Sequence, residues 1–334
     1  MAELRWNPMI RDWTMVASNR QNRPDMPKDW CPFCPGKGKN VPEKYEVFEY
    51  DNDYPALSQD PPQPQTPYCP GASDIYKVAP SYGKCEVILF SPEHEGRLCD
   101  LSVPHIRMIV DLWTERFIDI SSDKNIKYVF IFENRGAMVG VTMPHPHGQI
   151  YGYSVLPKKM ELELSSARDF KNENGRCLFC RINEEEKNFG ERVVYENDSF
   201  ICYIPFFEDY AYGTYISSKS HKQTIAQFDD KEKDDLADMI KNVTGAYDSL
   251  FPNVPRFPYM MCMHNAPVNL GSEAGDLSDY YHWHIEFYPT MRDDHRQQFM
   301  ASSETGVWAH CNPTAPEAKA AEIREAMKRF NENN

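Results

Sequence analysis

The segment His145-Pro146-His147-Gly148-Gln149, which continues as Ile150-Tyr151-Gly152-Tyr153, is the most informative stretch of this chain. Successive side chains of an extended segment point to opposite faces, so residues 145, 147 and 149 are expected to point the same way. One face then carries two imidazoles and an amide. The same spacing returns near the C-terminus as His282-Trp283-His284-Ile285-Glu286. The repeated pattern predicts a duplicated architecture.

The markers that precede each histidine pair also repeat in one order. They are a C-x-x-C pair and a lone histidine: Cys31, Cys34 and His94 in the first copy, and Cys177, Cys180 and His221 in the second. Hydrophobic periodicity predicts a strand, a helix and a strand in each copy, at residues 84–90, 103–120 and 128–132, and again at 214–217, 236–247 and 259–263. A capping box at residues 314–317 predicts a last helix that reaches residue 330.

We therefore predict an α/β protein of the α+β type. It should contain an antiparallel-rich sheet with helices packed on it, built from two similar halves around a pseudo-twofold axis. The expected halves are residues 1–165, with the first histidine pair, and residues 166–334, with the second.

Composition narrows the class of protein. A chain of 334 residues with 41% hydrophobic residues can bury a sizeable core. Its formal charge of −14 argues against binding to nucleic acid, although small phosphate esters need only a local set of donors. The N-terminus lacks a signal-like pattern and no apolar run has bilayer length, so we expect a cytoplasmic protein without a membrane anchor. In that compartment the two C-x-x-C pairs indicate metal sites rather than disulfides.

Two zinc sites follow from this pattern, because a C-x-x-C turn supplies two thiolates that distant histidines can complete. The first set is Cys31, Cys34, His94 and His145, and the second is Cys177, Cys180, His221 and His282. The alternative is that these cysteines and histidines are ordinary core residues. A rival to the second set is a harder nitrogen and oxygen site for iron or zinc, formed by His264, His284, Glu286 and Glu163. Both can exist in one chain.

His147 is the candidate nucleophile. A neutral imidazole attacks phosphorus well and gives a labile phosphoramidate that a second acceptor can take over. A metal-bound His145 would fix the strand, and a carbonyl bonded to the other ring nitrogen of His147 would fix its tautomer. Gln149 on the same face can donate to a phosphate oxygen whose charge grows in the transition state. The alternative is that His147 is a further metal ligand or a structural histidine.

Other residues are candidates for nucleotide binding. Arg20 and Arg23 can hold phosphate through their planar donor forks, unless they are simply solvated surface residues. The pair Asn52-Asp53 can bind a ribose diol, although Asp-rich turns are common.

Together these residues resemble the galactose-1-phosphate uridylyltransferases, the nucleotidyltransferase branch of the histidine-triad superfamily. The resemblance is closest at residues 132–136 (F-E-N-R-G) and 144–150 (P-H-P-H-G-Q-I), and it continues at 20–24, 31–34, 52–54, 91–94, 264–267 and 287–289. It implies two fused histidine-triad-like halves and a homodimer. It also implies small-molecule substrates, namely sugar nucleotides and hexose 1-phosphates.

The resemblance further implies a ping-pong reaction of the type that exchanges UDP-glucose with galactose 1-phosphate. His147 would take uridylyl from a UDP-hexose, release hexose 1-phosphate, and pass uridylyl to a second hexose 1-phosphate. Gln149 would hold the phosphoryl group. By position, the contacts to the nucleotide and its phosphates would be Arg20, Arg23, Asn52, Asp53, Asn134, Gly140 and Thr142.

The chain departs from the family pattern in three places. Many members carry two histidines as iron ligands directly before F-Y-P, where this chain has His284-Ile285-Glu286. The second C-x-x-C pair looks more like that of the plant-type ADP-glucose phosphorylases, which transfer AMP to phosphate. In the sugar-binding segment Gln298 replaces the usual lysine, so the sugar stays open, and Phe299 and Glu304 are expected to contact it across a dimer interface.

Two alternatives to uridylyl transfer therefore remain. One is an ADP-glucose phosphorylase or another nucleotidyltransferase of the same family. The other is a non-catalytic nucleotide-binding protein held together by zinc.

Overall fold

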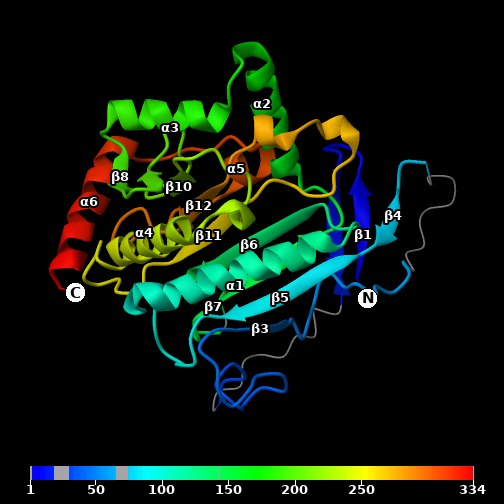
Figure 1. Cartoon of the computed structure of the whole chain (residues 1–334), viewed down its shortest axis with the longest axis horizontal. Helices are drawn as coiled ribbons and strands as arrows, with labels where there is room; N and C mark the ends of the chain where they lie inside the picture. Colours follow the sequence, from blue (N-terminus) through cyan, green and yellow to red (C-terminus); the bar gives the residue numbers. More distant parts are fainter. Residues whose placement is uncertain (1, 19–29, 65–73, 142, 334) are drawn as a thin grey trace.

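The structure, a computed structural model, describes residues 2–18, 30–64, 74–141 and 143–333. Its main feature is a nine-stranded antiparallel sheet (Figure 1). In spatial order the strands are β3 (Phe48–Asp51), β5 (Gly83–Leu89), β7 (His147–Tyr153), β6 (Tyr128–Arg135), β11 (Tyr259–His264), β12 (His284–Pro289), β10 (Thr214–Ser218), β9 (Phe200–Tyr203) and β8 (Val193–Glu196). A small second sheet contains β2 (Asp12–Ala17), β1 (Ala2–Asn7) and β4 (Val78–Pro80).

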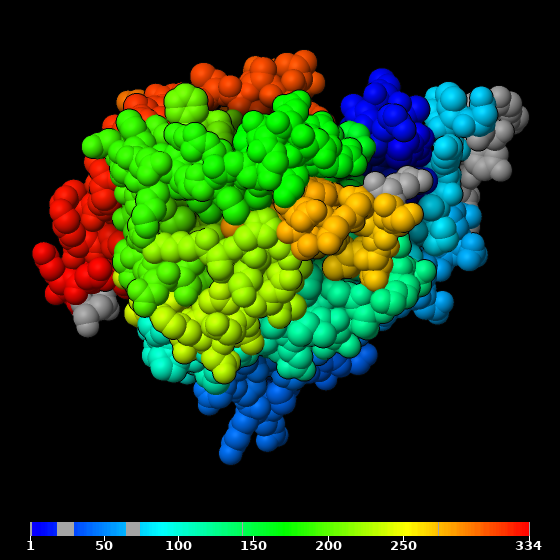
Figure 2. Space-filling view, turned by 45° about the horizontal axis from the view of Figure 1, so that its top comes forward, coloured from blue at the N-terminus to red at the C-terminus, as the bar shows by residue number. Residues whose placement is uncertain are grey.

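Helices pack on this sheet. They are α1 (Val103–Ser122), α2 (Lys158–Asn174), α3 (Leu178–Phe189), α4 (Asp230–Asp248) and α6 (Pro316–Glu332). The short α5 helix (Ser302–Val307) buries none of its residues. The α1 and α4 helices lie side by side on one face, and α6 packs against α4 (Figures 1 and 2). The α1 helix buries Ile106, Ile109, Val110 and Trp113, whose spacing places them on one side. None of the described helices is long and apolar enough to span a membrane.

The strand order confirms the predicted antiparallel sheet with helices packed on it, and it displays the duplication. The first copy contributes β3-β5-β7-β6 and the second contributes β9-β10-β12-β11, with β6 and β11 paired at the centre. The α1 helix connects β5 to β6, and α4 connects β10 to β11. The expected boundary between residues 165 and 166 falls within α2, and the two copies share one continuous sheet.

The segment that precedes β3 brings the first C-x-x-C pair to the sheet. This blue segment projects from the lower edge of the molecule in Figure 2. Its residues Cys31, Phe33 and Val41 pack against Val87 and Leu89 of β5. A wrapping segment without regular structure therefore supplies one wall of the site.

Some local predictions were wrong. The α6 helix begins at Pro316 with Ala315 as its N-cap, and no side chain caps it. Thr314 instead donates to Asn312 Oδ1 at 2.8 Å, and Glu317 accepts a hydrogen bond from Arg192 at 2.7 Å. The strands expected around the histidine pairs begin at the second histidine of each pair, because the first histidine turns toward the cysteines.

Candidate active site and metal centres

The first histidine pair lies at the start of β7. His147 is paired with Leu89 of β5, and Gln149 is paired with Phe132 of β6. His147 Nδ1 donates a hydrogen bond to the backbone oxygen of His145 at 2.8 Å. This bond places the proton on Nδ1 and the lone pair on Nε2, which is the tautomer that a nucleophilic imidazole needs.

Aromatic packing fixes the two rings. Phe33, inside the first C-x-x-C pair, lies edge-on to His147 with ring centroids 5.0 Å apart and to His145 at 6.0 Å. Gly148 faces the other side of the strand, where a Cβ would lie 2.8 Å from the Phe90 ring and 3.0 Å from the Phe132 oxygen. The glycine of the motif is therefore required by packing on the helix side of the sheet.

Gln149 is oriented by two neighbours. Tyr151 OH donates to Gln149 Oε1 at 3.1 Å, and Asn52 Nδ2 donates to the same oxygen at 3.5 Å. The carbonyl oxygen of the amide is thereby engaged, and its NH₂ group is the donor end. Gln149 can present this donor to a phosphate on the face that it shares with His147.

The other predicted nucleotide-binding residues are distributed around this face. Asn134 and His147 line one cavity of about 340 Å³. Gly140 ends a 3₁₀ turn, Ala137–Val139, with φ at 80°, a conformation that favours glycine. Asp53 is exposed next to Asn52. The remaining predicted contacts, Arg20, Arg23 and Thr142, lie outside the described residues.

The first predicted zinc set is assembled. Cys31 Sγ lies 3.7 Å from His145 Nδ1, and Cys34 Sγ lies 3.7 Å from His94 Nδ1. In tetrahedral zinc coordination, a sulfur and a nitrogen ligand are about 3.5 Å apart. His145 Nε2 donates to the Ser91 oxygen at 2.8 Å, so its Nδ1 lone pair faces the cysteines. Burial and the neighbouring Cys31 raise the pKa of the Cys34 thiol to about 11, so a bound cation is needed to ionise it.

The second predicted zinc set is assembled in the same way from Cys177, Cys180, His221 and His282. Cys180 Sγ lies 3.3 Å from His221 Nδ1 and 3.4 Å from His282 Nδ1. The Nε2 atom of each histidine bonds to a backbone carbonyl, at 2.7 and 2.8 Å. These donor sets fit a metal ion in both copies.

His284 is the counterpart of His147 in the second copy. Its Nδ1 lies 3.1 Å from the His282 oxygen, just as His147 Nδ1 bonds to the preceding histidine of its own pair. Phe179 packs on its ring at 5.1 Å, as Phe33 packs on His147. In both copies the second histidine therefore bonds to the backbone oxygen of the first and contacts the phenylalanine of the C-x-F-C motif.

The two copies differ at the reactive nitrogen. His284 is 2% exposed, and its Nε2 lies 3.3 Å from Oε1 of Glu286, which replaces the amide of Gln149. Its ring also stacks on Tyr215 with centroids 5.7 Å apart. The imidazole in the second copy is therefore enclosed by protein.

The rival metal set, Glu163, His264, His284 and Glu286, also forms one cluster. The ring of His264 lies between the two carboxylates: its Nδ1 is 3.1 Å from Glu163 Oε2, and its Nε2 is 3.3 Å from Glu286 Oε2. Glu163 Oε1 is buried without a hydrogen-bond partner among the described residues, which fits a cation ligand. However, Lys159 Nζ already donates to Glu286 Oε2 at 2.5 Å. This ammonium competes with a metal for the same carboxylate.

Comparison with known proteins places this geometry in a family. Models of the N-terminal and C-terminal domains of galactose-1-phosphate uridyl transferase match residues 2–157 and 163–327. The chain is 39% identical over 326 residues to the galactose-1-phosphate uridylyltransferase of Thermotoga maritima, covering 97% of this chain and 98% of that relative. The chain belongs to the galactose-1-phosphate uridyl transferase family.

Other members of the galactose-1-phosphate uridyl transferase family agree. The rat galactose-1-phosphate uridylyltransferase is 31% identical over 341 residues, covering 96% of this chain and 86% of the rat protein. A solved uridylyltransferase structure superposes with a TM-score of 0.87 at 29% identity, covering 98% of this chain and 99% of that chain. An Arabidopsis thaliana ADP-glucose phosphorylase with bound ADP-glucose shares the fold, with a TM-score of 0.73 at 24% identity and coverage of 97% and 99%.

The sugar-binding segment expected from the galactose-1-phosphate uridyl transferase family lies apart from the cavity that contains His147. Phe299 is 71% exposed, and Glu304 accepts a hydrogen bond from the Ala301 backbone at 3.0 Å. Gln298 is buried, and its amide bonds to the Ala211 nitrogen and the Asp209 oxygen at 3.0 and 2.7 Å. Within a single chain, the structure therefore does not bring Phe299 and Glu304 together with His147.

Sequence reasoning missed several residues of the site. Phe33 and Phe179 hold the histidine rings, and the shared C-x-F-C pattern was the signal that could have identified them. Lys159 had no such signal, because its contact with Glu286 joins residues 127 positions apart. Arg97, Arg135 and Arg256, which line the cavity beside His147, were also missed.

Glu133 lines the same cavity, and its replacement by glutamine is expected to change how stability depends on pH. Burial raises the pKa of Glu133 from 4.5 to about 7. The unfolded chain therefore loses this proton at lower pH than the folded chain does, and stability falls as the pH rises from about 4.5 through about 7. Between about pH 5 and pH 8 the free energy of unfolding, measured in urea, should fall by about 2–3 kcal/mol more for the wild-type protein than for Glu133→Gln. The control is Glu325→Gln, at an exposed position, whose free energy of unfolding should depend on pH as that of the wild type does. If Glu133→Gln also showed the wild-type dependence on pH, the predicted effect of burial would be contradicted.

Proposed function

We propose that this chain is a hexose-1-phosphate uridylyltransferase that works by ping-pong double displacement through a uridylyl-His147 intermediate. The observation that carries the proposal is the hydrogen bond from His147 Nδ1 to the His145 oxygen at 2.8 Å, in the P-H-P-H-G-Q motif of the family. This bond supports Nε2 as the attacking atom. Membership of the family supports a sugar nucleotide as the donor.

In the first step the Nε2 lone pair forms an N–P bond to the α-phosphorus of a UDP-hexose. The P–O bond to the β-phosphate breaks, and its electron pair stays on hexose 1-phosphate. No general acid is required, because the leaving group is itself a phosphate. In the second step an oxygen of another hexose 1-phosphate attacks the same phosphorus, and the N–P electron pair returns to His147. Gln149 donates to the phosphoryl oxygen in both steps.

Several residues are proposed to bind the nucleotide. Asn52 contacts Gln149, and Asn134 shares the cavity with His147, which supports their roles. Asp53 is exposed beside Asn52, where it can reach a ribose diol. Gly140, Arg20, Arg23 and Thr142 are proposed as contacts from the family pattern.

The first two clusters are proposed as zinc sites. Two thiolates and two imidazoles with these separations suit Zn²⁺. At the first site the metal supplies structural order rather than chemistry: when bound, it fixes His145, whose carbonyl oxygen in turn sets the tautomer of His147. The third cluster, Glu163, His264, His284 and Glu286, offers ligands suited to iron or zinc. When no metal is bound there, the ammonium of Lys159 neutralises Glu286.

We also propose that the enzyme is a cytoplasmic homodimer. Phe206, Phe299 and Trp308 are 73%, 71% and 56% exposed, and exposed aromatic residues are typical of protein interfaces. Such an interface would carry Phe299 and Glu304 to the sugar of the partner chain. The nine described cysteines form no disulfide among themselves, which suits a reducing compartment.

The proposal is tested by intact-mass measurement after mixing the protein with UDP-glucose, UDP-galactose or ADP-glucose. Covalent addition of uridylyl from a UDP-hexose is the expected result. Addition of adenylyl alone would favour the ADP-glucose phosphorylase alternative. Binding of a sugar nucleotide without any covalent adduct would favour a non-catalytic nucleotide-binding protein.

A further inference from the structure

The third cluster is built from two neighbouring strands and one helix. On β12, His284, Glu286 and Tyr288 are spaced two residues apart, so their side chains point to the same face of the sheet. His264 of β11 is paired with His284. Glu163 reaches the same group from α2, where its Oε2 lies 3.1 Å from His264 Nδ1. The fold thereby gathers two carboxylates and two imidazoles, with one ligand atom of each within 4.8 Å of the others.

Lys159 adds a cation to this group. It lies on α2 four residues before Glu163, so the two side chains lie on the same side of the helix. Its Nζ donates hydrogen bonds to Glu286 Oε2, at 2.5 Å, and to Tyr288 OH. It also lies 3.9 Å from Glu163 Oε1 and 5.1 Å from the centre of the Tyr288 ring. One ammonium is therefore within ion-pairing distance of both carboxylates of the third cluster.

Burial makes a cation necessary at this place. Glu286 is 2% exposed, and a buried carboxylate is costly unless a positive group neutralises it. The side chain of Lys159, in contrast, retains 54% of its accessible surface, so it reaches the buried carboxylate from the solvent side. A metal ion that binds Glu286 has to displace this ammonium, and the exposed lysine side chain has room to turn away into solvent.

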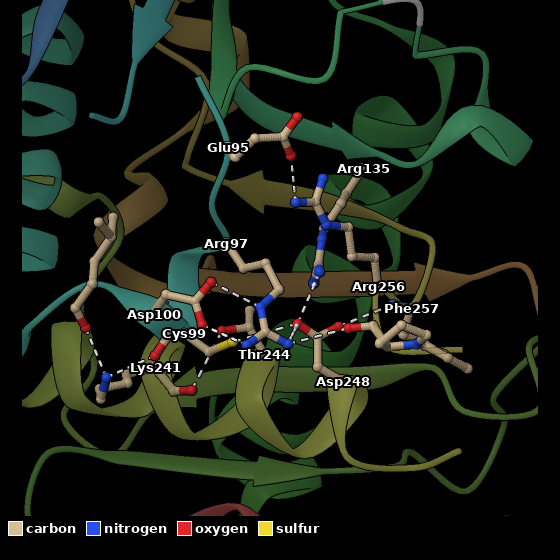
Figure 3. Close-up of polar contacts among 12 residues, drawn as sticks. Glu95, Arg97, Cys99, Asp100, Arg135, Lys241, Thr244, Asp248, Arg256 and Phe257 are labelled. Carbon is tan, nitrogen blue, oxygen red and sulfur yellow. Dashed lines mark hydrogen bonds and ion pairs between the residues drawn. The ribbon is translucent and has the colours of Figure 1, made fainter. Parts of the chain in front are cut away.

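A second buried carboxylate, Asp248 at the end of α4, is neutralised in a different way (Figure 3). Its Oδ2 accepts a hydrogen bond from Arg135 Nη2 at 2.8 Å and lies 3.4 Å from Arg97 Nη1, and its Oδ1 accepts from the Phe257 nitrogen at 2.9 Å. Among the described residues Asp248 belongs to no group of metal-binding side chains. Glu286 does belong to one, and its partner is a lysine, whose ammonium is a compact point charge as a metal ion is.

We propose that Lys159 takes the place of a metal ion in the third cluster and sets the affinity of the cluster for divalent transition metals. Its ammonium neutralises Glu286, so an ion binds to the four ligands only when it displaces the lysine. This inference concerns the ligand set alone and does not rest on uridylyl transfer. Transfer through His147 can therefore fail while the role of Lys159 stands.

Titration of the intact protein with Co²⁺ tests the inference. Co²⁺ in the third cluster would have only nitrogen and oxygen ligands, so its spectrum should lack the cobalt–thiolate absorption expected at the two cysteine clusters. Lys159→Met retains the length of the side chain and removes its charge. This variant should bind thiolate-free Co²⁺ about 10- to 100-fold more tightly than the wild-type protein does, because no charge-assisted hydrogen bond has to be broken first.

Three further variants identify the cause of the change in affinity. Lys158→Met makes the same replacement at the neighbouring lysine, which pairs with the exposed Glu161, and it should bind Co²⁺ as the wild type does. Lys159→Arg keeps a positive charge beside Glu286, so its affinity for Co²⁺ should stay close to the wild-type value. Glu163→Gln, combined with Lys159→Met, should remove most of the gain, which would locate the bound ion in the third cluster.

The inference is overturned if Lys159→Met and the wild-type protein bind thiolate-free Co²⁺ with equal affinity, or if neither binds it. Because Lys159→Met leaves Glu286 buried without its partner, the melting temperature is measured with and without Co²⁺. A larger rise on adding Co²⁺ to this variant than to the wild type would support the inference, since the ion then replaces the ammonium. A variant that stays unfolded even with Co²⁺ would contradict it, because the ion then cannot substitute for the lysine.

Discussion

Replacing His147 with alanine is expected to lower the rate of uridylyl transfer by roughly 10⁴-fold or more. In the proposed mechanism both half-reactions pass through the N–P bond to this imidazole, so the loss should affect donor and acceptor steps alike. Neither neighbour can take over, because Gln149 offers only an amide and the Nδ1 lone pair of His145 faces two cysteines. The exchange between UDP-glucose and radiolabelled galactose 1-phosphate measures the rate, and intact mass measures the adduct.

The matched control for this prediction is His295→Ala. His295 is an exposed histidine whose side chain retains 76% of its accessible surface, and it should be dispensable for transfer. Wild-type protein and His295→Ala should both acquire one uridylyl group, whereas His147→Ala should acquire none. If His147→Ala exchanged uridylyl at the wild-type rate, the proposal that His147 is the nucleophile would be wrong.

Replacing Cys31 with serine is expected to remove one equivalent of zinc per chain and to slow transfer about 100-fold. The reason is that one residue, His145, links the proposed zinc site to the proposed nucleophile, His147. The side chain of His145 faces Cys31 Sγ at 3.7 Å, and its backbone oxygen accepts the hydrogen bond from His147 Nδ1. When the cluster loosens, that oxygen moves and the imidazole loses its fixed tautomer. Elemental analysis and exchange kinetics measure the two effects.

The second cluster provides the contrast. Cys177→Ser should also remove one equivalent of zinc and lower the melting temperature, yet transfer should stay near the wild-type rate, because the counterpart histidine His284 is buried. Cys311→Ser, at an exposed cysteine, should change neither zinc content nor rate. Equal losses of transfer in Cys31→Ser and Cys177→Ser would show that zinc acts through global stability instead.

Much of this architecture could be predicted because the same order of motifs occurs twice in the sequence. The order of C-x-x-C pair, lone histidine and histidine pair identified both cysteine and histidine clusters, and the structure assembles each one. Hydrophobic periodicity located α1, α4 and the central strands, since each presents an apolar side to one shared core.

The remainder depended on contacts between distant residues. The sheet of β1, β2 and β4 pairs residues 3–5 with residues 78–80, which lie on either side of the first cysteines in the sequence. Arg135 and Asp248 are 113 positions apart, and no local sequence pattern predicts their ion pair. The predicted capping box at 314–317 does not form, because the Thr314 hydroxyl donates to Asn312 Oδ1 and Glu317 accepts a hydrogen bond from Arg192.

The burial of the His284 ring limits how many transferable groups one chain can carry. Its reactive nitrogen faces Glu286 and its face is covered by Tyr215, so a substrate arriving from solvent has no approach to it. A polypeptide with two copies of the same catalytic framework should therefore carry a single transferable group at saturation. Under the proposed mechanism, duplication has yielded one reactive histidine, His147, and one enclosed counterpart, His284.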